Sequence, residues 1–268
     1  MKKKTGYSVG GIVAGIAVAA VLIIATVFVI DGNNKATKFE DYDFFSLIEG
    51  TKDNGNIADH IKGYDPATGK ITEDAAIASK APVIIYEYAD YQCSGCAGMN
   101  TRLNNLIEEM EGKVSVVYRS YLLSYHQNAT AAASAAEAAA MQGYWKLYAD
   151  KLFNSQSEWF YATGSERTAL FNKYFLEVTD NKGDLDKFTS DIASEAVSKK
   201  ISFDMGSGQR IDIQATPALF FDGKYLDLTS GKFEIAGETF TWDKDGLTNE
   251  ELNTLLKNIV NAMLEETA

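Results

Sequence analysis

Cysteine, histidine and proline are scarce in this chain, which has two cysteines, two histidines and three prolines among 268 residues. A structural zinc site takes four ligands and a catalytic zinc site takes three, mostly from cysteine and histidine. The two histidines, His60 and His126, have no HxxxH-type spacing, and a second CxxC pair is absent from the sequence. The composition therefore argues against a metal site.

The two cysteines, Cys93 and Cys96, stand close together in the stretch YADYQCSGCAGMN. A disulfide between them closes a very small loop, and the stabilisation from loop closure grows with loop length. A disulfide whose role is to stabilise the fold is therefore a poor explanation for the pair. Thiol–disulfide chemistry is the interpretation that we favour over metal binding and over an inert disulfide.

Basic residues are outnumbered by acidic residues after the first thirty positions. Residues 1–30 carry three lysines and no acidic residue, so the rest of the chain has 22 of the 25 basic residues and all 37 acidic ones, a net charge of −15. Such a domain repels nucleic acid and anionic membrane surfaces, so neither is expected as a partner.

One long segment, residues 9–30, lacks charge altogether and reads VGGIVAGIAVAAVLIIATVFVI. Its length is enough to cross a hydrocarbon layer of roughly 30 Å as a helix. Lysines precede the segment in residues 1–8, so the positive-inside rule predicts a cytoplasmic N-terminus and an extracytoplasmic remainder. A cleaved signal peptide is the alternative, but its apolar region usually spans only about 7–15 residues. We therefore expect a single-pass cell-membrane anchor.

The region after the anchor begins with residues 31–80, which we interpret as a polar tether and an N-terminal extension with one or two strands. A buried strand is expected at 83–89 (VIIYEYA), where β-branched and aromatic residues dominate. A helix ending at Gly112 and a second strand at 113–121 follow. This order of strand, CxxC, helix and strand is expected for a βαβ unit.

The second half of the chain begins with a helical block and ends with strands and a helix. Helices are expected over 129–142, 144–153, around 165–177 and over 184–199, and strands over 216–226 and 232–242. A turn is predicted at Asp222-Gly223. Thr248 and Glu251 form a capping-box pattern at the start of the last helix.

The two cysteines are predicted to differ in reactivity. Cys93 would lie where the strand gives way to the helix, and the unpaired N–H groups and dipole of a helix N-terminus stabilise a thiolate. Cys96, one turn inside the helix, would be shielded and would act as the resolving thiol. Ser94 and Gly95 between them add no cation.

Pro217 is the second element of the predicted site. X–Pro bonds are where cis peptides occur, and the residue before a proline is pushed toward extended geometry. We expect a cis Thr216–Pro217 bond that turns the backbone of Thr216 outward, next to Cys93, to pair with a substrate peptide. An ordinary trans proline at the start of a strand is the alternative.

Three blocks of sequence resemble the DsbA-like thiol–disulfide oxidoreductases, in the right order and spacing over roughly residues 80–265. They are VIIYEYADYQCSGC, YRSYLLSYHQNATAAASAAEAAAMQGYWKLYADKLFNSQ and ATPALFFDGKYL. The resemblance implies an α/β fold, a thioredoxin domain (81–126 and 206–268) with an inserted helical domain (127–205). It also implies Cys93 as nucleophile, Cys96 as resolving cysteine and Pro217 as the cis-proline. The best-known members carry Pro-His between the cysteines, whose histidine helps to hold the thiolate, where this chain has Ser-Gly.

Further residues near the pair are candidates for supporting roles. Glu87 corresponds to a buried acid in many members of that family and could relay protons to Cys96, although the strand pattern also allows a solvent-facing side chain. Asp90 is the rival acid. His126 is expected to pack or cap rather than to catalyse, and Tyr91, Ser94 and Gly95 are expected to line the substrate site.

The resulting expectation is a membrane-tethered thiol–disulfide oxidoreductase that passes its disulfide to reduced exported proteins. It needs no bound cofactor and is expected to be a monomer. The resemblance suggests reoxidation by a quinone-linked membrane partner. A tethered reductase or isomerase is the enzymatic alternative, and a tethered peptide-binding module with an inert disulfide is the non-enzymatic one.

Overall fold

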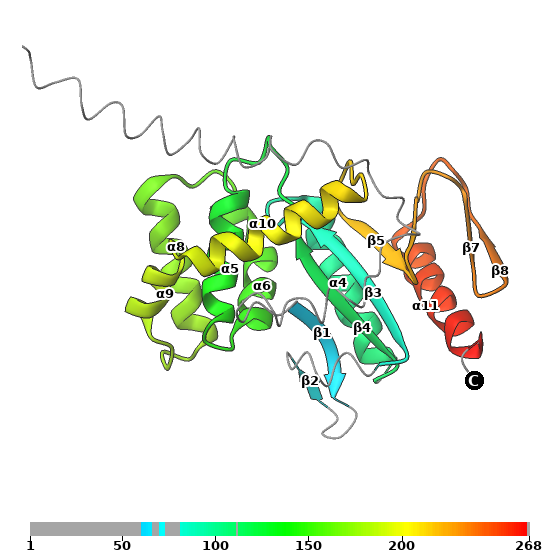
Figure 1. Ribbon diagram of the computed structural model, residues 1–268, viewed down its shortest axis with the longest axis horizontal. Helices are drawn as coiled ribbons and strands as arrows, with labels where there is room; N and C mark the ends of the chain where they lie inside the picture. The colour runs from blue at the N-terminus through cyan, green and yellow to red at the C-terminus, as the bar shows by residue number, and fades with distance from the viewer. Residues whose placement is uncertain (1–59, 66–69, 73–80, 111, 267–268) are drawn as a thin grey trace, which may run out of the picture. The chain divides into compact units, whose positions relative to one another are not determined.

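The computed structural model describes residues 60–65, 70–72, 81–110 and 112–266 (Figure 1). These residues all belong to one unit of the chain, Lys38–Ala268. The predicted anchor at 9–30 and most of the predicted tether lie outside the described residues. Within the described part of the chain, none of the helices combines the length and the apolar character that crossing a membrane requires.

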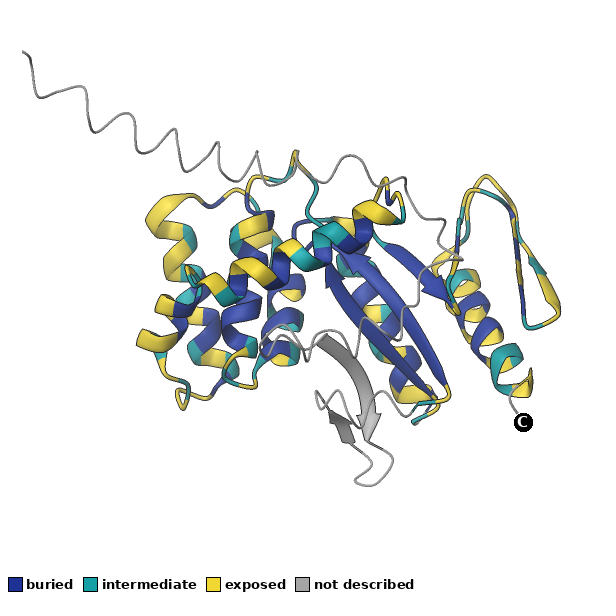
Figure 2. Cartoon of the chain, viewed as in Figure 1, coloured by how far each residue is buried: buried dark blue, intermediate teal, exposed yellow. Residues whose placement is uncertain are grey.

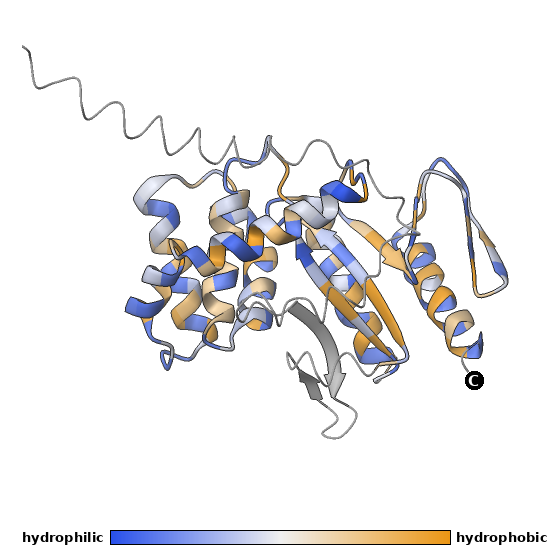
Figure 3. Ribbon diagram, viewed as in Figure 1, coloured by the Kyte–Doolittle hydropathy of each residue, from blue (hydrophilic) through white to orange (hydrophobic). Residues whose placement is uncertain are grey.

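A six-stranded sheet with the order β2-β1-β4-β3-β5-β6 forms the centre of the fold (Figure 1). Its strands are β1 His60–Asp65, β2 Lys70–Thr72, β3 Val83–Ala89, β4 Val114–Ser120, β5 Ala218–Phe221 and β6 Lys224–Tyr225. β3 runs parallel to β4 and antiparallel to β5. Every residue of β3, β4 and β5 is buried, as their β-branched and aromatic composition predicts (Figures 2 and 3).

Helices cover both faces of the sheet. On one face, α4 (Ser94–Glu109), α11 (Asn249–Glu266) and the hairpin β7–β8 (Lys232–Ile235, Glu238–Thr241) close an apolar core. On the other face, α10 (Glu195–Arg210) lies against β3 and β4, where the Tyr88 hydroxyl is 3.0 Å from Ser207 Oγ and Ser120 N donates to Asp204 Oδ2 at 3.0 Å. The central strands are thus covered on both faces, as expected for the parallel pair β3 and β4.

A block of helices separates β4 from β5 and packs around a second core. It comprises α5 Ala129–Ala140, α6 Trp145–Asn154, α7 Gln156–Trp159, α8 Gly164–Val178, α9 Leu185–Asp191 and α10. α5 is buried on nearly all sides because alanine lets neighbouring helices approach closely (Figure 2). The inserted helical domain was predicted over 127–205, and its last helix continues to Arg210.

Most predicted elements agree with the structure, with differences at some boundaries. The helix expected over 184–199 is two helices, because the chain turns at Ile192–Ser194 and Ser194 caps α10 by accepting the Val197 N–H at 3.3 Å. The strand expected over 232–242 is the hairpin β7–β8, and the helix expected to end at Gly112 ends at Glu109. The turn predicted at Asp222-Gly223 joins β5 to β6. The predicted capping box is confirmed by hydrogen bonds between Thr248 and Glu251.

Candidate active site

The CxxC pair occupies the turn between β3 and α4. Cys93 is the N-terminal cap of α4, its N–H donates to Asp90 O at 3.0 Å, and its carbonyl accepts the Ala97 N–H at 3.1 Å. Cys93 is half-buried, Ser94 and Gly95 are exposed, and Cys96 is fully buried. Both cysteines are free thiols. The expected asymmetry of exposure between the two sulfurs is therefore present.

The surroundings of Cys93 favour its thiolate. A hydrogen bond from the Cys96 side chain is the largest of several effects that lower the pKa of the Cys93 thiol to about 5. The backbone N–H groups of Cys96 and Gly95 and the side chain of Thr216 act in the same direction, and partial burial opposes them. The two N–H groups belong to the first turn of α4, where N–H groups have no partner within the helix, and Thr216 belongs to the proline loop, which carries Pro217.

The thiol of Cys96 is much less acidic than that of Cys93. Burial holds the pKa of its thiol well above the usual range, and the hydrogen bond and charge of Cys93 raise it further, as does the charge of Glu87. The backbone N–H of Asp90 lies 3.5 Å from the Cys96 sulfur. One thiol of the pair is therefore charged and accessible, and the other is protonated and shielded.

Pro217 lies directly against this turn, and the Thr216–Pro217 bond is cis, as predicted. Cys93 Sγ lies 3.4 Å from the Thr216 carbonyl oxygen, which accepts a hydrogen bond from the thiol when Cys93 is protonated. A methyl group placed on Gly95 would lie 3.2 Å from Pro217 Cδ and 3.6 Å from Cys93 Sγ. The CxxC turn and the proline loop, more than 120 positions apart in sequence, thus form one surface.

Glu87 is fully buried in β3, behind the cysteine pair. In the sheet its Cα is paired with those of Tyr118 and Leu219. Its charge raises the pKa of Cys96. Glu87 is therefore an interior side chain, not a solvent-facing one, and it acts electrostatically on the resolving thiol.

Asp90 has a buried carboxylate whose oxygens hold the loops around the site. Oδ1 accepts the Gln92 N–H at 2.8 Å, and Oδ2 accepts the Leu123 N–H at 2.9 Å and lies 2.8 Å from His126 Nδ1. This arrangement fits a positioning role for Asp90 better than that of a proton relay. His126 is thereby hydrogen-bonded to the segment that precedes Cys93.

Tyr91 differs from the expectation that it would line the substrate site. Its side chain is fully buried, with its ring centroid 5.2 Å from that of Tyr118 and 5.0 Å from that of Phe153. Its hydroxyl accepts the indole N–H of Trp145 at 3.1 Å. Because no part of the ring reaches the surface, Tyr91 supports the site from the core and does not contact a substrate.

The family profile described as Thioredoxin matches residues 75–257, which is more than half of the chain. The chain belongs to the thioredoxin family.

Individual relatives agree with this assignment. The chain is 25% identical to the probable disulfide bond formation protein D of Bacillus cereus, over 67% of this chain and 79% of that protein. It shares its fold with the DsbA-like protein alpha-DsbA1 of Wolbachia pipientis, with a TM-score of 0.53, 21% identity and coverage of 78% of this chain and 94% of that one. The likeness to the Wolbachia protein shows a shared fold.

A further relative is a Na+/H+ antiporter NhaA of Herminiimonas arsenicoxydans, which is 28% identical over 63% of this chain and 23% of that protein. The chain thus spans about a quarter of the length of the first curated relatives that it matches. This partial match carries no inference about ion transport.

The side chains of Gln92 and Asn128 form hydrogen bonds that join the CxxC turn to the inserted helices, and the sequence did not predict them. Gln92 Oε1 accepts the Asn128 N–H at 2.6 Å, and Gln92 Nε2 donates to Phe160 O at 2.9 Å. Asn128 Nδ2 donates to three carbonyls, including Ala162 O at 3.0 Å, and Asn128 Oδ1 accepts from Arg167. Amide side chains carry no periodic signal, so only the position of Gln92 next to Cys93 could have suggested a role.

Over the described ranges, no group of three or more His, Cys, Asp or Glu side chains is arranged to hold a metal ion. The chemistry available here is that of the two sulfurs and the groups that set their charge.

The acidity of Cys93 gives the first prediction. Because its pKa is about 5, Cys93 should react with iodoacetamide at half its maximal rate near that pH, far below the value of about 8.5 for an ordinary cysteine. Alkylation of the reduced chain, followed at each site by mass spectrometry, measures this. Cys96→Ala should raise the Cys93 pKa, because it removes the main hydrogen-bond donor. A wild-type midpoint above about pH 8 would contradict the assignment.

Proposed function

We propose that this protein is an extracytoplasmic thiol–disulfide oxidoreductase that introduces disulfides into exported proteins through the Cys93–Cys96 pair. The observation that carries the proposal is the contrast between the low pKa of half-exposed Cys93 and the raised pKa of buried Cys96. A thiolate that is stabilised in the reduced state makes the corresponding disulfide a stronger oxidant. This favours oxidation over the reductase and isomerase alternatives.

The reaction begins with the oxidised pair. A substrate thiolate attacks Cys93 Sγ, a substrate–Cys93 disulfide forms, and the Cys93–Cys96 bond breaks, so that Cys96 leaves as a thiolate and takes up a proton. A second substrate thiolate then attacks the substrate sulfur and displaces Cys93. The substrate has lost two electrons and two protons, the pair has gained the two electrons, and one proton is bound to Cys96 while the other goes to solvent because Cys93 remains a thiolate. Because a thiol of lower pKa leaves faster, the low pKa of Cys93 speeds this second step.

The surface around Cys93 supports access by a polypeptide. Ser94 and Gly95 are exposed and leave the approach to the sulfur open. The Thr216 backbone, whose carbonyl lies 3.4 Å from Cys93 Sγ, is the proposed docking edge for an extended substrate segment. Pro217 keeps a backbone N–H away from the sulfurs.

The location and the partners follow from the sequence outside the described residues. We propose that residues 9–30 anchor the chain in the cell membrane with residues 1–8 in the cytoplasm, which places the redox pair where disulfides persist. Reduced exported proteins are then the substrates. Each cycle leaves the pair reduced, so a membrane redox partner must take up the two electrons. The similarity to a Bacillus cereus protein named for disulfide bond formation supports this direction.

Glu87 is the proposed proton donor to Cys96 when that sulfur leaves. Glu87→Gln keeps the shape but removes the exchangeable proton, and should slow oxidation of a dithiol peptide by at least about tenfold, since general acid catalysis commonly contributes about 10²–10⁴. Single-turnover kinetics of the oxidised chain measures this, with the exposed Glu158→Gln as the matched control. If Glu87 only raised the pKa of Cys96, its removal would make Cys96 a better leaving group, so a faster reaction would contradict the proton role.

The direction of the reaction is tested by the equilibrium of the pair with glutathione. We expect a reduction potential nearer to about −120 mV, the value of strong periplasmic oxidants, than to about −270 mV, that of thioredoxin. Gly95→His places an imidazole next to the thiolate and should raise the potential by about 30 mV, a tenfold change in the equilibrium constant. Gly95→Ala controls for the added Cβ beside Pro217. A wild-type potential near that of thioredoxin would favour the reductase alternative.

A further inference from the structure

The backbone N–H of Asp90 is directed at the sulfur of the resolving cysteine. It lies 3.5 Å from Cys96 Sγ, and both residues are fully buried. In the reduced chain this sulfur belongs to a protonated thiol, because burial holds the pKa of Cys96 well above the usual range. A neutral sulfur is a weak hydrogen-bond acceptor. The contact therefore adds little to the stability of the resting state.

Cys96 carries a negative charge whenever the disulfide of the pair breaks or forms. When a substrate thiolate attacks Cys93 Sγ of the oxidised pair, the Cys93–Cys96 bond breaks and its electron pair stays on Cys96 Sγ. When the pair is oxidised again, Cys96 loses its proton, and its thiolate attacks Cys93 Sγ of a mixed disulfide and expels the other sulfur. A hydrogen bond to a charged acceptor is stronger than one to a neutral acceptor. An N–H group beside Cys96 Sγ therefore stabilises the developing charge in both transition states.

The peptide group that carries this N–H is held in place through its carbonyl oxygen. Ala89 O accepts the Tyr121 N–H at 2.8 Å and the Tyr118 hydroxyl at 3.4 Å. The C=O and N–H of a trans peptide point in opposite directions, so two donors on the Ala89 carbonyl direct the Asp90 N–H away from them, toward Cys96. Hydrogen bonds to the carbonyl also polarise the peptide group, which makes its N–H a stronger donor.

The Asp90 carboxylate fixes the chain that follows this peptide group. Oδ1 accepts the Gln92 N–H at 2.8 Å, and the Asp90 carbonyl accepts the Cys93 N–H at 3.0 Å, so the chain turns tightly here. Oδ2 lies 2.8 Å from His126 Nδ1 and accepts the Leu123 N–H at 2.9 Å, which joins the turn to the loop after β4. The carboxylate thus restricts the movement of the residue whose N–H faces Cys96.

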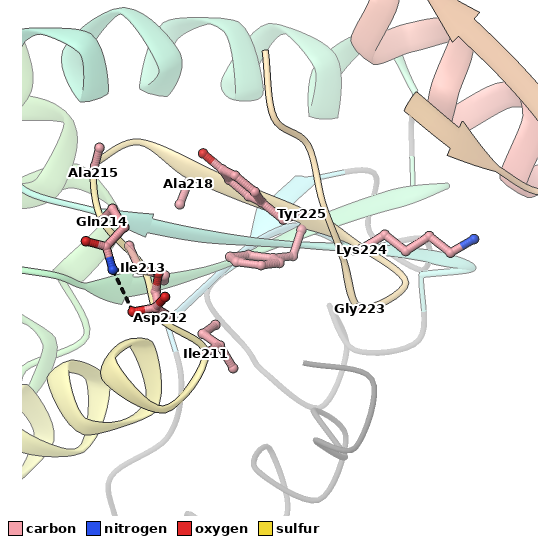
Figure 4. Close-up of a pocket in the computed structure, with 10 residues that line it drawn as sticks. Ile211, Asp212, Ile213, Gln214, Ala215, Ala218, Gly223, Lys224 and Tyr225 are labelled. Carbon is pink, nitrogen blue, oxygen red and sulfur yellow. Dashed lines mark hydrogen bonds between the residues drawn. The ribbon is translucent and has the colours of Figure 1, made fainter. Parts of the chain in front are cut away.

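Tyr121 connects the same peptide group to the proline loop. Besides the N–H that Ala89 O accepts, Tyr121 has a hydroxyl that donates to Ile213 O at 2.7 Å. Ile213 belongs to the loop 211–215, which connects α10 to Thr216 and forms one wall of a pocket beside β5 and β6 (Figure 4). One residue therefore holds both the peptide group beside the buried sulfur and the loop that leads to the exposed one.

We propose that the Asp90 N–H is the hydrogen-bond donor that stabilises the Cys96 thiolate during exchange, and that the Asp90 carboxylate and His126 are positioning residues for it. This inference rests on the proposed function and adds to its mechanism a group that speeds the breaking and the re-forming of the disulfide. The role is separate from that of Glu87, which is proposed to give a proton to the same sulfur.

The test follows the two cysteines of the reduced full-length chain separately, by stopped-flow absorbance with excess dithiodipyridine at neutral pH. Cys93 attacks the reagent and releases one thiopyridone. Cys96 then attacks the Cys93–pyridyl disulfide, closes the Cys93–Cys96 bond and releases the second thiopyridone. The rate of this second phase does not depend on the reagent concentration, because the step is intramolecular. It therefore measures the Cys96 thiolate alone.

Asp90→Asn keeps the size of the side chain but replaces an oxygen that accepts hydrogen bonds with an amide that donates them. It should slow the second phase at least about tenfold, since a hydrogen bond to a charged group is stronger than one between neutral groups, and should move the pH midpoint of that phase upward. The first phase should stay the same, because Cys93, with a pKa of about 5, is already ionised. His126→Ala should slow the second phase less, and the exposed Asp186→Asn, the matched control, should change neither phase.

The sign and the selectivity of the effect decide the outcome. If the carboxylate acted only through its negative charge, Asp90→Asn would favour the Cys96 thiolate, so a faster second phase would overturn the inference. Equal slowing of both phases would also overturn it, because Asp90 would then support the CxxC turn as a whole. If Asp90→Asn does not fold, Tyr118→Phe, which removes only one hydroxyl from the core, takes its place, and an unchanged second phase would contradict the inference.

The wild-type chain separates this inference from the proposed function. Release of a single thiopyridone by the wild-type chain would mean that Cys96 does not close the disulfide, and would contradict both. Two phases in the wild-type chain that Asp90→Asn leaves unchanged would overturn the role of Asp90 and leave the proposed function intact.

Discussion

The hydrogen bond between the two cysteine side chains, across the first turn of α4, is the interaction on which the redox site depends. It allows Cys93 to carry a negative charge at a half-buried position while Cys96 stays protonated in the interior. Each partner needs the other, because burial alone would raise the pKa of both thiols. The sheet supplies the remaining constraint. β3 ends where β5 begins, so the CxxC turn and the Thr216–Pro217 loop meet at one edge although they are far apart in sequence.

Hydrogen bonds to the inserted helices, and to the loop that leads into them, hold the CxxC turn in place. Gln92, next to Cys93, is hydrogen-bonded to the N-terminus of α5 and to the carbonyl of Phe160, and the Asp90 carboxylate joins the CxxC turn to the loop that leads into α5. Movement of the helices against the sheet would therefore shift the two sulfurs. The same loops leave Ser94 and Gly95 exposed. A substrate can therefore approach Cys93, while Cys96 stays buried among hydrogen-bonded segments.

Sequence reasoning was most successful where the chemistry is local. The CxxC spacing, the β-branched run of β3 and the capping box of α11 each involve a few neighbouring residues, and each prediction agrees with the structure. The cis bond at Pro217 was predicted from its combination with an upstream CxxC, and it is confirmed. Tyr91 was expected at the surface because it is close to Cys93 in sequence, but its ring packs against Tyr118 and Phe153, a contact that only the tertiary fold makes. The Asp90–His126 contact and the contact of Tyr121 with the proline loop also depend on segments that only the tertiary fold brings together.

The central claim is that Cys93 forms the bond to the substrate and Cys96 resolves that bond. Trapping of mixed disulfides tests this claim most directly. If Cys93 forms the bond to the substrate and Cys96 resolves it, the Cys93 thiolate of Cys96→Ser should attack a substrate disulfide, expel one substrate thiolate and stay bonded to the other sulfur, because the Cys96 thiol that would displace the substrate is gone. Cys93→Ser should form none, since its remaining sulfur is fully buried. Mass spectrometry of non-reduced complexes from both variants identifies the bonded cysteine. Equal trapping by the two variants, or complexes bonded through Cys96, would contradict this account.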